Sequence, residues 1–167
     1  MLIDRVWAMP SKHTFTIKPI RKLLVEEMVG HARWLDPFAG FNSPAFMTND
    51  LNPAAPTLYH MDALEWLRSL NTGYDGVIYD PPYSMRQASE CYMSYGRELL
   101  TATVTSMAYW SNVKNEIARL LRPGGKAVCF GWSSMGIGIK RGFTMSRVLL
   151  VPHGGSRNDT IVTVEYK

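Results

Sequence analysis

Short β-like runs alternate with helix-like patterns along the whole chain, and this alternation most constrains the fold. The clearest run is YDGVIYD at 74–80, which is apolar in its middle and is ended by Pro81 and Pro82. Further β-like runs lie at 32–36, 45–51 and 127–132, with a possible short one at 57–60. Helical patterns lie between Pro19 and Gly30, over 61–70 and over 107–121. Alternating strands and helices form parallel sheets covered on both faces. The sequence therefore predicts an α/β fold with a doubly wound, mostly parallel sheet.

The last part of the chain departs from this alternation. Two β-rich runs, at 143–153 and 159–167, are joined by the turn-forming sequence GGSRN. This pattern predicts an antiparallel hairpin, and we expect it at the edge of the sheet. Residues 84–105 are polar and aromatic without a clear period, so we expect loop with some helix there.

Length and composition favour a single domain over 1–167. The chain has 167 residues, of which 46% are hydrophobic, enough for one well-buried core but not for two. It contains no run of about 18 apolar residues, so we expect no membrane span, and its first residues do not resemble a signal peptide. Cys91 and Cys129 match neither a disulfide framework nor a zinc site, and the histidines show no metal-binding pattern. These features predict a cytoplasmic protein that holds no metal.

Three of the predicted strands end in an acidic residue: Asp36, Asp50 and Asp80. In an open α/β sheet, ligands bind at the carboxyl ends of the strands, near the point where strand order reverses. Any one such carboxylate can be a helix cap or a turn former instead. Three at consecutive strand ends, two of them followed by proline, indicate a binding site.

Two of these strand ends carry distinctive motifs, DPFAG at 36–40 and DPPY at 80–83. Together they resemble the first and fourth motifs of the amino-group DNA methyltransferases. The resemblance also runs through IKPI at 17–20 and LLRPGGK at 120–126, and the motif order is similar to that of the adenine-modifying members. It implies a Rossmann-like fold with S-adenosylmethionine as cofactor and the adenine amino group in DNA as target. The compact form resembles small bacteriophage-encoded enzymes.

The chemistry of the 80–83 segment agrees with this resemblance. Pro81 and Pro82 fix φ and lack backbone donors, which leaves a stiff loop rich in acceptors. An exocyclic amine donates two N–H bonds, which Asp80 and the Pro81 carbonyl can accept. Its lone pair would then turn away from the ring and become nucleophilic toward a methyl group in one in-line displacement. Tyr83 would hold a base that has left the helical stack. We therefore predict that Asp80, Pro81, Pro82 and Tyr83 are catalytic.

The resemblance also implies a set of cofactor-binding residues. Asp36 to Gly40 would lie against the methionine part of the cofactor, with Asp36, Pro37, Phe38 and Gly40 as contacts. Asp50, with Leu51, would accept hydrogen bonds from the ribose hydroxyls. Asp62, with Ala63, resembles the residue that contacts the adenine amine, although an N-cap of the following helix explains Asp62 equally well. Lys18 and Pro19 fall where the N-terminal motif of the family lies against the cofactor.

The chain departs from the family at two points. Asn42 stands where a second glycine is common, and asparagine tolerates positive φ better than most residues. No separate target-recognition region fits in 167 residues. We therefore expect a short target context, or recognition completed by a second copy or a partner subunit. With a net charge of +4, the candidate contacts to nucleic acid are loop cations: Arg86, Arg97, Lys140, Arg141 and Arg157.

Several related activities stay open at this point. Methylation of a cytosine carbon is excluded, because it needs a cysteine, usually after proline, and neither Cys91 nor Cys129 follows one. Amino-cytosine methylation remains possible, although serine is commoner than Asp80 in that branch. Amino methylation of guanine or adenine in RNA also remains, as does a non-catalytic subunit that only binds nucleic acid. The retained acidic strand ends favour an enzyme, and DNA is preferred over RNA.

Overall fold

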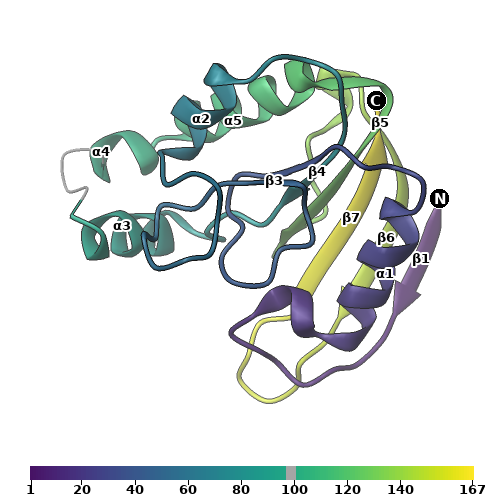
Figure 1. The fold of residues 1–167 in the computed structure, drawn as a ribbon. Helices are drawn as coiled ribbons and strands as arrows, with labels where there is room; N and C mark the ends of the chain where they lie inside the picture. The colour runs from purple at the N-terminus through teal and green to yellow at the C-terminus, as the bar shows by residue number, and fades with distance from the viewer. Residues whose placement is uncertain (97–100) are drawn as a thin grey trace.

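The computed structural model describes residues 1–96 and 101–167, which form one seven-stranded sheet flanked by helices (Figure 1). The strand order is β1-β6-β7-β5-β4-β2-β3. Every neighbouring pair is parallel except the two pairs that β7 makes, with β5 and with β6. The predicted mostly parallel α/β sheet with an antiparallel C-terminal hairpin is confirmed.

The strands are β1 (Leu2–Arg5), β2 (Trp34–Asp36), β3 (Met47–Thr48), β4 (Tyr74–Tyr79), β5 (Leu121–Gly131), β6 (Thr144–Val151) and β7 (Thr160–Tyr166). The α-helices are α1 (Lys18–Met28), α2 (Ala63–Ser69), α3 (Met85–Ser94), α4 (Thr101–Val104) and α5 (Met107–Leu120). Two short 3-10 turns are η1 (Thr14–Thr16) and η3 (Ile139–Arg141).

Most predicted elements are present, with shorter or longer bounds. Pro19 lies in the first turn of α1, where its missing N–H removes no helical hydrogen bond. The run at 45–51 contributes only the two residues of β3, and the run at 57–60 contributes a single bridge, from Tyr59 to Asn49. The ambiguous segment 84–105 holds α3 and α4.

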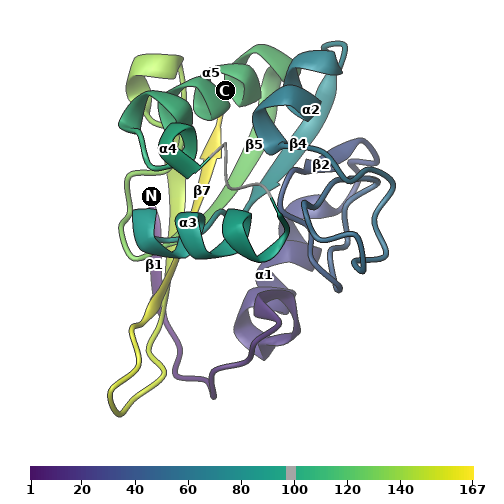
Figure 2. The same ribbon diagram turned by 90° about the vertical axis from the view of Figure 1, so that its left-hand side faces the viewer.

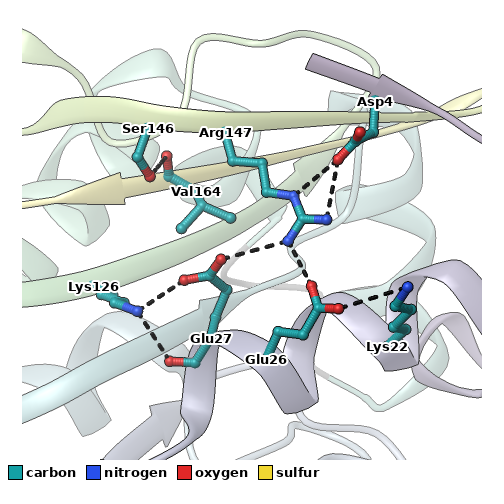
Figure 3. A network of polar contacts seen from close by, with 8 residues as sticks. All are labelled: Asp4, Lys22, Glu26, Glu27, Lys126, Ser146, Arg147 and Val164. Carbon is teal, nitrogen blue, oxygen red and sulfur yellow. Dashed lines mark hydrogen bonds and ion pairs between the residues drawn. The ribbon is translucent and has the colours of Figure 1, made fainter. Parts of the chain in front are cut away.

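The expectation that the hairpin forms the sheet edge is wrong. β7 lies inside the sheet, and β1 pairs in parallel with the outer side of β6. Figure 3 shows the charged contacts that attach β1 and α1 to β6. Arg147 of β6 forms ion pairs with Asp4 of β1 at 3.0 Å and with Glu26 of α1 at 2.7 Å. Lys126 of β5 reaches Glu27 of α1 at 2.8 Å. Because the partners of β1 lie far along the chain, the sequence around residues 2–5 gives little indication that they form an edge strand.

The helices divide between the two faces of the sheet, as the doubly wound pattern requires. α1 packs on one face through Ile20, Leu23 and Leu24. The opposite face is covered by α2, α3, α4 and α5, which Figure 2 shows on the side nearer the viewer. Within the sheet, Trp34 of β2 lies directly against Gly76 of β4, where an added Cβ would be only 2.7 Å from the indole ring. Gly76 therefore makes room for the largest buried side chain of β2.

The parallel strands bring their carboxyl ends to a single edge of the sheet. The segments that follow β2, β3, β4 and β5 therefore meet there, where α/β proteins bind ligands. Within residues 1–96 and 101–167, each helix is too short or too polar to cross a lipid bilayer.

Candidate active site

An open cavity of about 320 Å³ lies at the carboxyl edge of the sheet. The segments after β2, β3 and β4 all contribute to its wall, as does α3. Nine of the residues predicted to form the site line this cavity: Pro37, Phe38, Asp50, Leu51, Ala63, Asp80, Pro81, Pro82 and Tyr83. Residues that lie up to 46 positions apart in the chain, from Pro37 to Tyr83, are therefore brought together as the sequence motifs predict.

The 80–83 segment is held in one conformation by hydrogen bonds at both ends. The Tyr83 hydroxyl donates to Oδ1 of Asp80 at 2.7 Å, and the Tyr83 backbone N–H donates to Oε1 of Gln87 at 2.8 Å. Ser84 then caps α3, because its hydroxyl accepts from the Gln87 N–H at 3.2 Å. The two prolines between these contacts have no N–H to satisfy. The segment therefore presents fixed acceptors to the cavity.

The environment of Asp80 changes its acidity. Burial raises the pKa of this carboxyl to about 6, and hydrogen bonds from the hydroxyls of Tyr83 and Thr14 partly oppose the rise. At neutral pH the carboxylate form predominates, so Asp80 accepts hydrogen bonds there. A carboxyl with this pKa can also take up a proton near neutrality.

Asp36 lies beneath the cavity and does not line it. Its side chain is fully buried, and its oxygens accept from the Phe38 N–H at 3.0 Å and from the Ser43 hydroxyl at 2.6 Å. Burial raises the pKa of Asp36 well above its ordinary value. Asp36 therefore shapes the loop after β2, and it is the following residues, Pro37 and Phe38, that face the cavity.

Asp50 joins the loops that follow β2 and β3. Its Oδ2 accepts from the Gly40 N–H at 2.8 Å, and its Oδ1 accepts from the Asn52 N–H at 2.8 Å. Gly40 adopts φ +55°, a conformation that favours glycine. Each carboxylate oxygen has a further lone pair, and Asp50 lines the cavity, so two acceptor positions remain for a ligand there.

Asn49 supports this edge of the sheet although no sequence motif indicates it. It is fully buried, and its side chain donates to the carbonyls of Pro37 at 3.2 Å and Met61 at 3.0 Å. Its Oδ1 accepts from the Met61 N–H at 2.9 Å. One amide therefore ties the loop after β2 to the segment before α2. No local pattern in the sequence reveals this contact, because the partners lie 12 residues away on either side.

The structure favours the helix-cap interpretation of Asp62 over contact with a ligand. Its Oδ1 accepts from the backbone N–H groups of Leu64 and Glu65, both at 3.0 Å. Its Oδ2 accepts from the hydroxyls of Tyr92 at 2.6 Å and Tyr109 at 2.7 Å. The side chain is 8% exposed and does not line the cavity, whereas the neighbouring Ala63 does. Asp62 thus fixes α2, α3 and α5 to one another beside the site.

A second cavity, of about 200 Å³, lies on the other side of the 80–83 segment, and Pro81, Pro82 and Tyr83 line both cavities. Its wall is rich in aromatic and thioether side chains. Trp132 contacts Tyr83 edge to face, with ring centroids 5.7 Å apart. Its other large lining side chains are Tyr79, Met85, Met107, Trp110, Lys114, Phe130 and Met135. The site therefore has two compartments that meet at the acceptor-rich segment.

The N-terminal segment contributes to the site in a way that the motifs do not predict, since Thr14 lines the first cavity. Lys12, His13 and Thr14 line a hollow that also includes Phe38, Gly40 and Asp80. Lys18, predicted to contact the cofactor, lies instead with its neighbour Pro19 in a separate hollow beside Asp4 and Arg147. Thr14 is the first residue of η1, which precedes α1, so the residues before the helix reach the site and the start of the helix does not.

The backbone at Asn42 does not require glycine, although the resembled family commonly has glycine at this position. No residue other than glycine in the described part of the chain adopts positive φ. Asn42 is exposed and lines the same hollow as Gly40 and Asp80. Asparagine is therefore accommodated at position 42 with an ordinary negative φ.

The predicted nucleic-acid contacts occupy different parts of the surface. Arg86, at the start of α3, and Arg157, in the turn between β6 and β7, are exposed at the carboxyl edge. Arg86 pairs with Glu90 at 2.7 Å. Arg141 is engaged in the fold, since it donates to Asn115, Ile137 and Ser111, and the exposed Lys140 lies beside it, on the α5 side. Arg97 lies outside the described residues.

The two thiols are poorly suited to nucleophilic catalysis. Burial raises the pKa of Cys129, and burial with the nearby Asp50 charge raises that of Cys91. A thiol with a raised pKa is protonated at neutral pH and is a weak nucleophile. The described residues contain no group of three or more His, Cys, Asp or Glu side chains that could hold a metal ion.

Comparison with solved structures identifies the fold. The chain is similar to 1,6-didemethyltoxoflavin-N1-methyltransferase from Burkholderia thailandensis, with a TM-score of 0.62 and 14% identity over 90% of this chain and 77% of that one. It is similar to the N-methyltransferase NodS from Bradyrhizobium japonicum, with a TM-score of 0.58 and 12% identity over 90% of this chain and 94% of NodS. TrmN from Thermus thermophilus gives a TM-score of 0.58 at 16% identity, and the match covers 90% of this chain and about half (49%) of TrmN.

No protein-family model matches the sequence, and no curated protein is similar to it. The similarity is therefore one of structure. The Burkholderia enzyme was solved with S-adenosylhomocysteine. The chain has the Rossmann-like fold of the S-adenosylmethionine-dependent methyltransferases.

Proposed function

We propose that the protein is an S-adenosylmethionine-dependent methyltransferase that acts on the exocyclic amino group of adenine in DNA. The observation that carries the proposal is the 80–83 segment between two cavities. Asp80 and the Pro81 carbonyl are acceptors, Tyr83 is an aromatic surface, and Tyr83 is hydrogen-bonded to Asp80 at 2.7 Å.

The first cavity fits the cofactor. Asp50 keeps an acceptor position on each oxygen, which suits two vicinal hydroxyls of a ribose. Phe38, Leu51 and Met61 supply apolar surface for the uncharged parts of such a ligand. When bound, S-adenosylmethionine would supply an electrophilic methyl group.

The second cavity suits the acceptor base. Aromatic and methionine side chains favour a planar ring that has left the stack, and Tyr83 lies where the two cavities meet. An adenine amine can donate one N–H to Asp80 and the other to the Pro81 carbonyl. These contacts orient the amine lone pair away from the ring, and Asp80 can accept the proton that the amine loses when its new N–C bond forms. Hydrogen bonding and positioning by the protein would thus replace covalent catalysis.

The decisive experiment uses the purified protein with radiolabelled S-adenosylmethionine and separate pools of unmethylated DNA and of RNA. Nucleoside analysis then identifies the product. We expect N6-methyladenine from DNA, and no transfer by the Asp80→Ala variant. Methylated cytosine, a methylated RNA nucleoside in place of methylated DNA, or no transfer to either pool would contradict the proposal.

A further inference from the structure

The segment after β5, residues 132–138, forms the outer wall of the second cavity. Trp132, Met135 and Gly136 line it, and Trp132 also touches Tyr83. Trp132 and Met135 are 44% and 69% exposed, so their own burial does little to fix this wall. Something else must hold the segment in place.

Three charged side chains from three different elements bind the backbone of residues 136–138. Glu165 of β7 accepts from the Ile137 N–H at 2.5 Å through Oε2 and from the Gly138 N–H at 3.1 Å through Oε1. Lys114 of α5 donates to the Gly136 carbonyl at 2.6 Å, and Arg141 of η3 donates to the Ile137 carbonyl at 3.0 Å. The segment is thus held through its peptide groups, whose positions do not depend on the exposed side chains.

Glu165 is the unusual member of this set. Its side chain is 2% exposed, and the other buried residues of β7 are apolar or threonine. Burying a carboxylate costs free energy unless the carboxylate is hydrogen-bonded. A well-packed apolar side chain is often at least as stabilising as a buried charged group, so stability alone gives little reason to keep Glu165. Gly136, with φ +53°, lies so close that an added Cβ would collide with the Glu165 carboxylate. This close contact between Gly136 and the Glu165 carboxylate leaves the 136–138 backbone little room to shift.

We propose that Glu165 is a positioning residue for the acceptor side of the active site. By holding the 136–138 backbone it places Trp132 against Tyr83, and thereby fixes the ring that would receive the flipped base. This inference rests on the proposed function for its substrate, but the contact between Trp132 and Tyr83 can be tested without any substrate.

The test compares Glu165→Gln with Val162→Ala. The glutamine has one oxygen for two N–H donors, so one amide of the pair loses its partner. Val162 is fully buried on the opposite face of the same strand, away from both cavities, and controls for a general loss of stability. Gly136→Ala, which displaces the carboxylate from the other side, serves as a second variant.

We expect Glu165→Gln and Gly136→Ala to weaken the nuclear Overhauser contact between the Trp132 and Tyr83 rings. In both variants, amide hydrogen exchange at Ile137 and Gly138 should accelerate at least about tenfold. The KM for DNA should rise about tenfold, whereas kcat and the affinity for S-adenosylhomocysteine should change less than about twofold. Val162→Ala should leave the ring contact and the KM unchanged.

An unchanged ring contact in Glu165→Gln would overturn the proposal, and so would an equal rise of KM in Val162→Ala. If the unmutated protein transfers no methyl group to DNA, the proposed function fails. The ring contact and the amide exchange then decide the positioning role by themselves.

Discussion

The hydroxyl of Tyr83 is hydrogen-bonded to the carboxylate of Asp80, so the aromatic surface and the acceptor of the site form one rigid unit. A ligand that stacks on the ring is presented to the carboxylate at a fixed angle. The bond also couples the chemistry of the two residues, because it stabilises the ionised form of Asp80.

This coupling predicts the pH dependence of methyl transfer. With the pKa of Asp80 at about 6, kcat should fall as the pH drops through 6, because the protonated carboxyl cannot accept both the amine N–H and the Tyr83 hydroxyl. Tyr83→Phe removes a hydrogen bond that lowers this pKa, so the acid limb should move to higher pH. The measurement is kcat from pH 4.5 to 9 at saturating cofactor. Asp80→Asn, the control, should lose at least about 100-fold in kcat and show no such limb.

The same pKa predicts how Asp80 affects stability. The folded-state pKa lies above the ordinary value of 3.8, so the folded protein binds this proton more tightly than the unfolded chain. The stabilisation is therefore complete below pH 3.8 and is lost as the pH rises through 6. Asp80→Asn removes the cost of the buried charge and should gain up to about 3 kcal/mol at pH 7 to 8, but nothing below pH 4. Urea unfolding at several pH values measures this, and a gain that is independent of pH would contradict it.

Asp50 should govern cofactor affinity. Replacement by alanine removes the acceptors of the Gly40 and Asn52 N–H groups together with the free positions in the cavity. Calorimetry should show S-adenosylhomocysteine bound at least about tenfold more weakly, since each unpaired buried group costs about 1–3 kcal/mol. Lys18→Ala is the matched control, because Lys18 lies in a separate hollow. An equal loss of S-adenosylhomocysteine affinity in the two variants would show that the cofactor does not bind in the cavity beside Asp50.

Asp62 should be a stability residue. Asp62→Ala leaves two helix N–H groups without their acceptor. It also removes the acceptor of the Tyr92 and Tyr109 hydroxyls, which lie 2.9 Å apart, so that only one of them can still donate, to the other. We expect a loss of about 2–4 kcal/mol in the free energy of unfolding. The double variant Tyr92→Phe, Tyr109→Phe should lose less, because the N-cap bonds remain. Thermal melting and urea titration check both, and an unchanged stability of Asp62→Ala would refute the cap role.

The exposed cations of the carboxyl edge should bind phosphate. Arg157→Ala and Arg86→Ala should weaken DNA binding to a similar extent on all sequences, and each should reduce the slope of log affinity against log salt by roughly one. Lys140→Ala is the control, because Lys140 lies on the α5 side of the domain. Titration of labelled duplexes over a range of salt concentrations gives the slopes. An equal effect of Lys140→Ala would show that contact with DNA is not confined to this edge.

The sequence predicts those parts of the molecule whose signals are local. The run at 74–80 gives β4 because its apolar residues are adjacent and prolines end it, and the same prolines mark the stiff acceptor segment. Gly40 and Asp50 are each predicted to contact the cofactor, and the structure shows that the Gly40 N–H donates to Asp50, ten residues later.

What the sequence does not predict depends on partners far along the chain. α3 has an irregular pattern, and Tyr92 attaches it to Asp62, 30 residues earlier. Asn49 looks like an ordinary polar residue in a turn, yet it is buried because its amide serves two other segments. Glu165 reads as an exposed strand residue, and only its contact with residues 137 and 138 explains its burial.

The pairing of β1 with β6 has a consequence for how the chain is made. Leu2 aligns with Arg147, so β1 leaves the ribosome long before its partner strand β6 has been synthesised. Until then its exposed side chains, Leu2 and Ile3 among them, have no strand beside them. The ion pair between Asp4 and Arg147 can form only after Arg147 has been synthesised, so β1 joins the sheet well after it has been made.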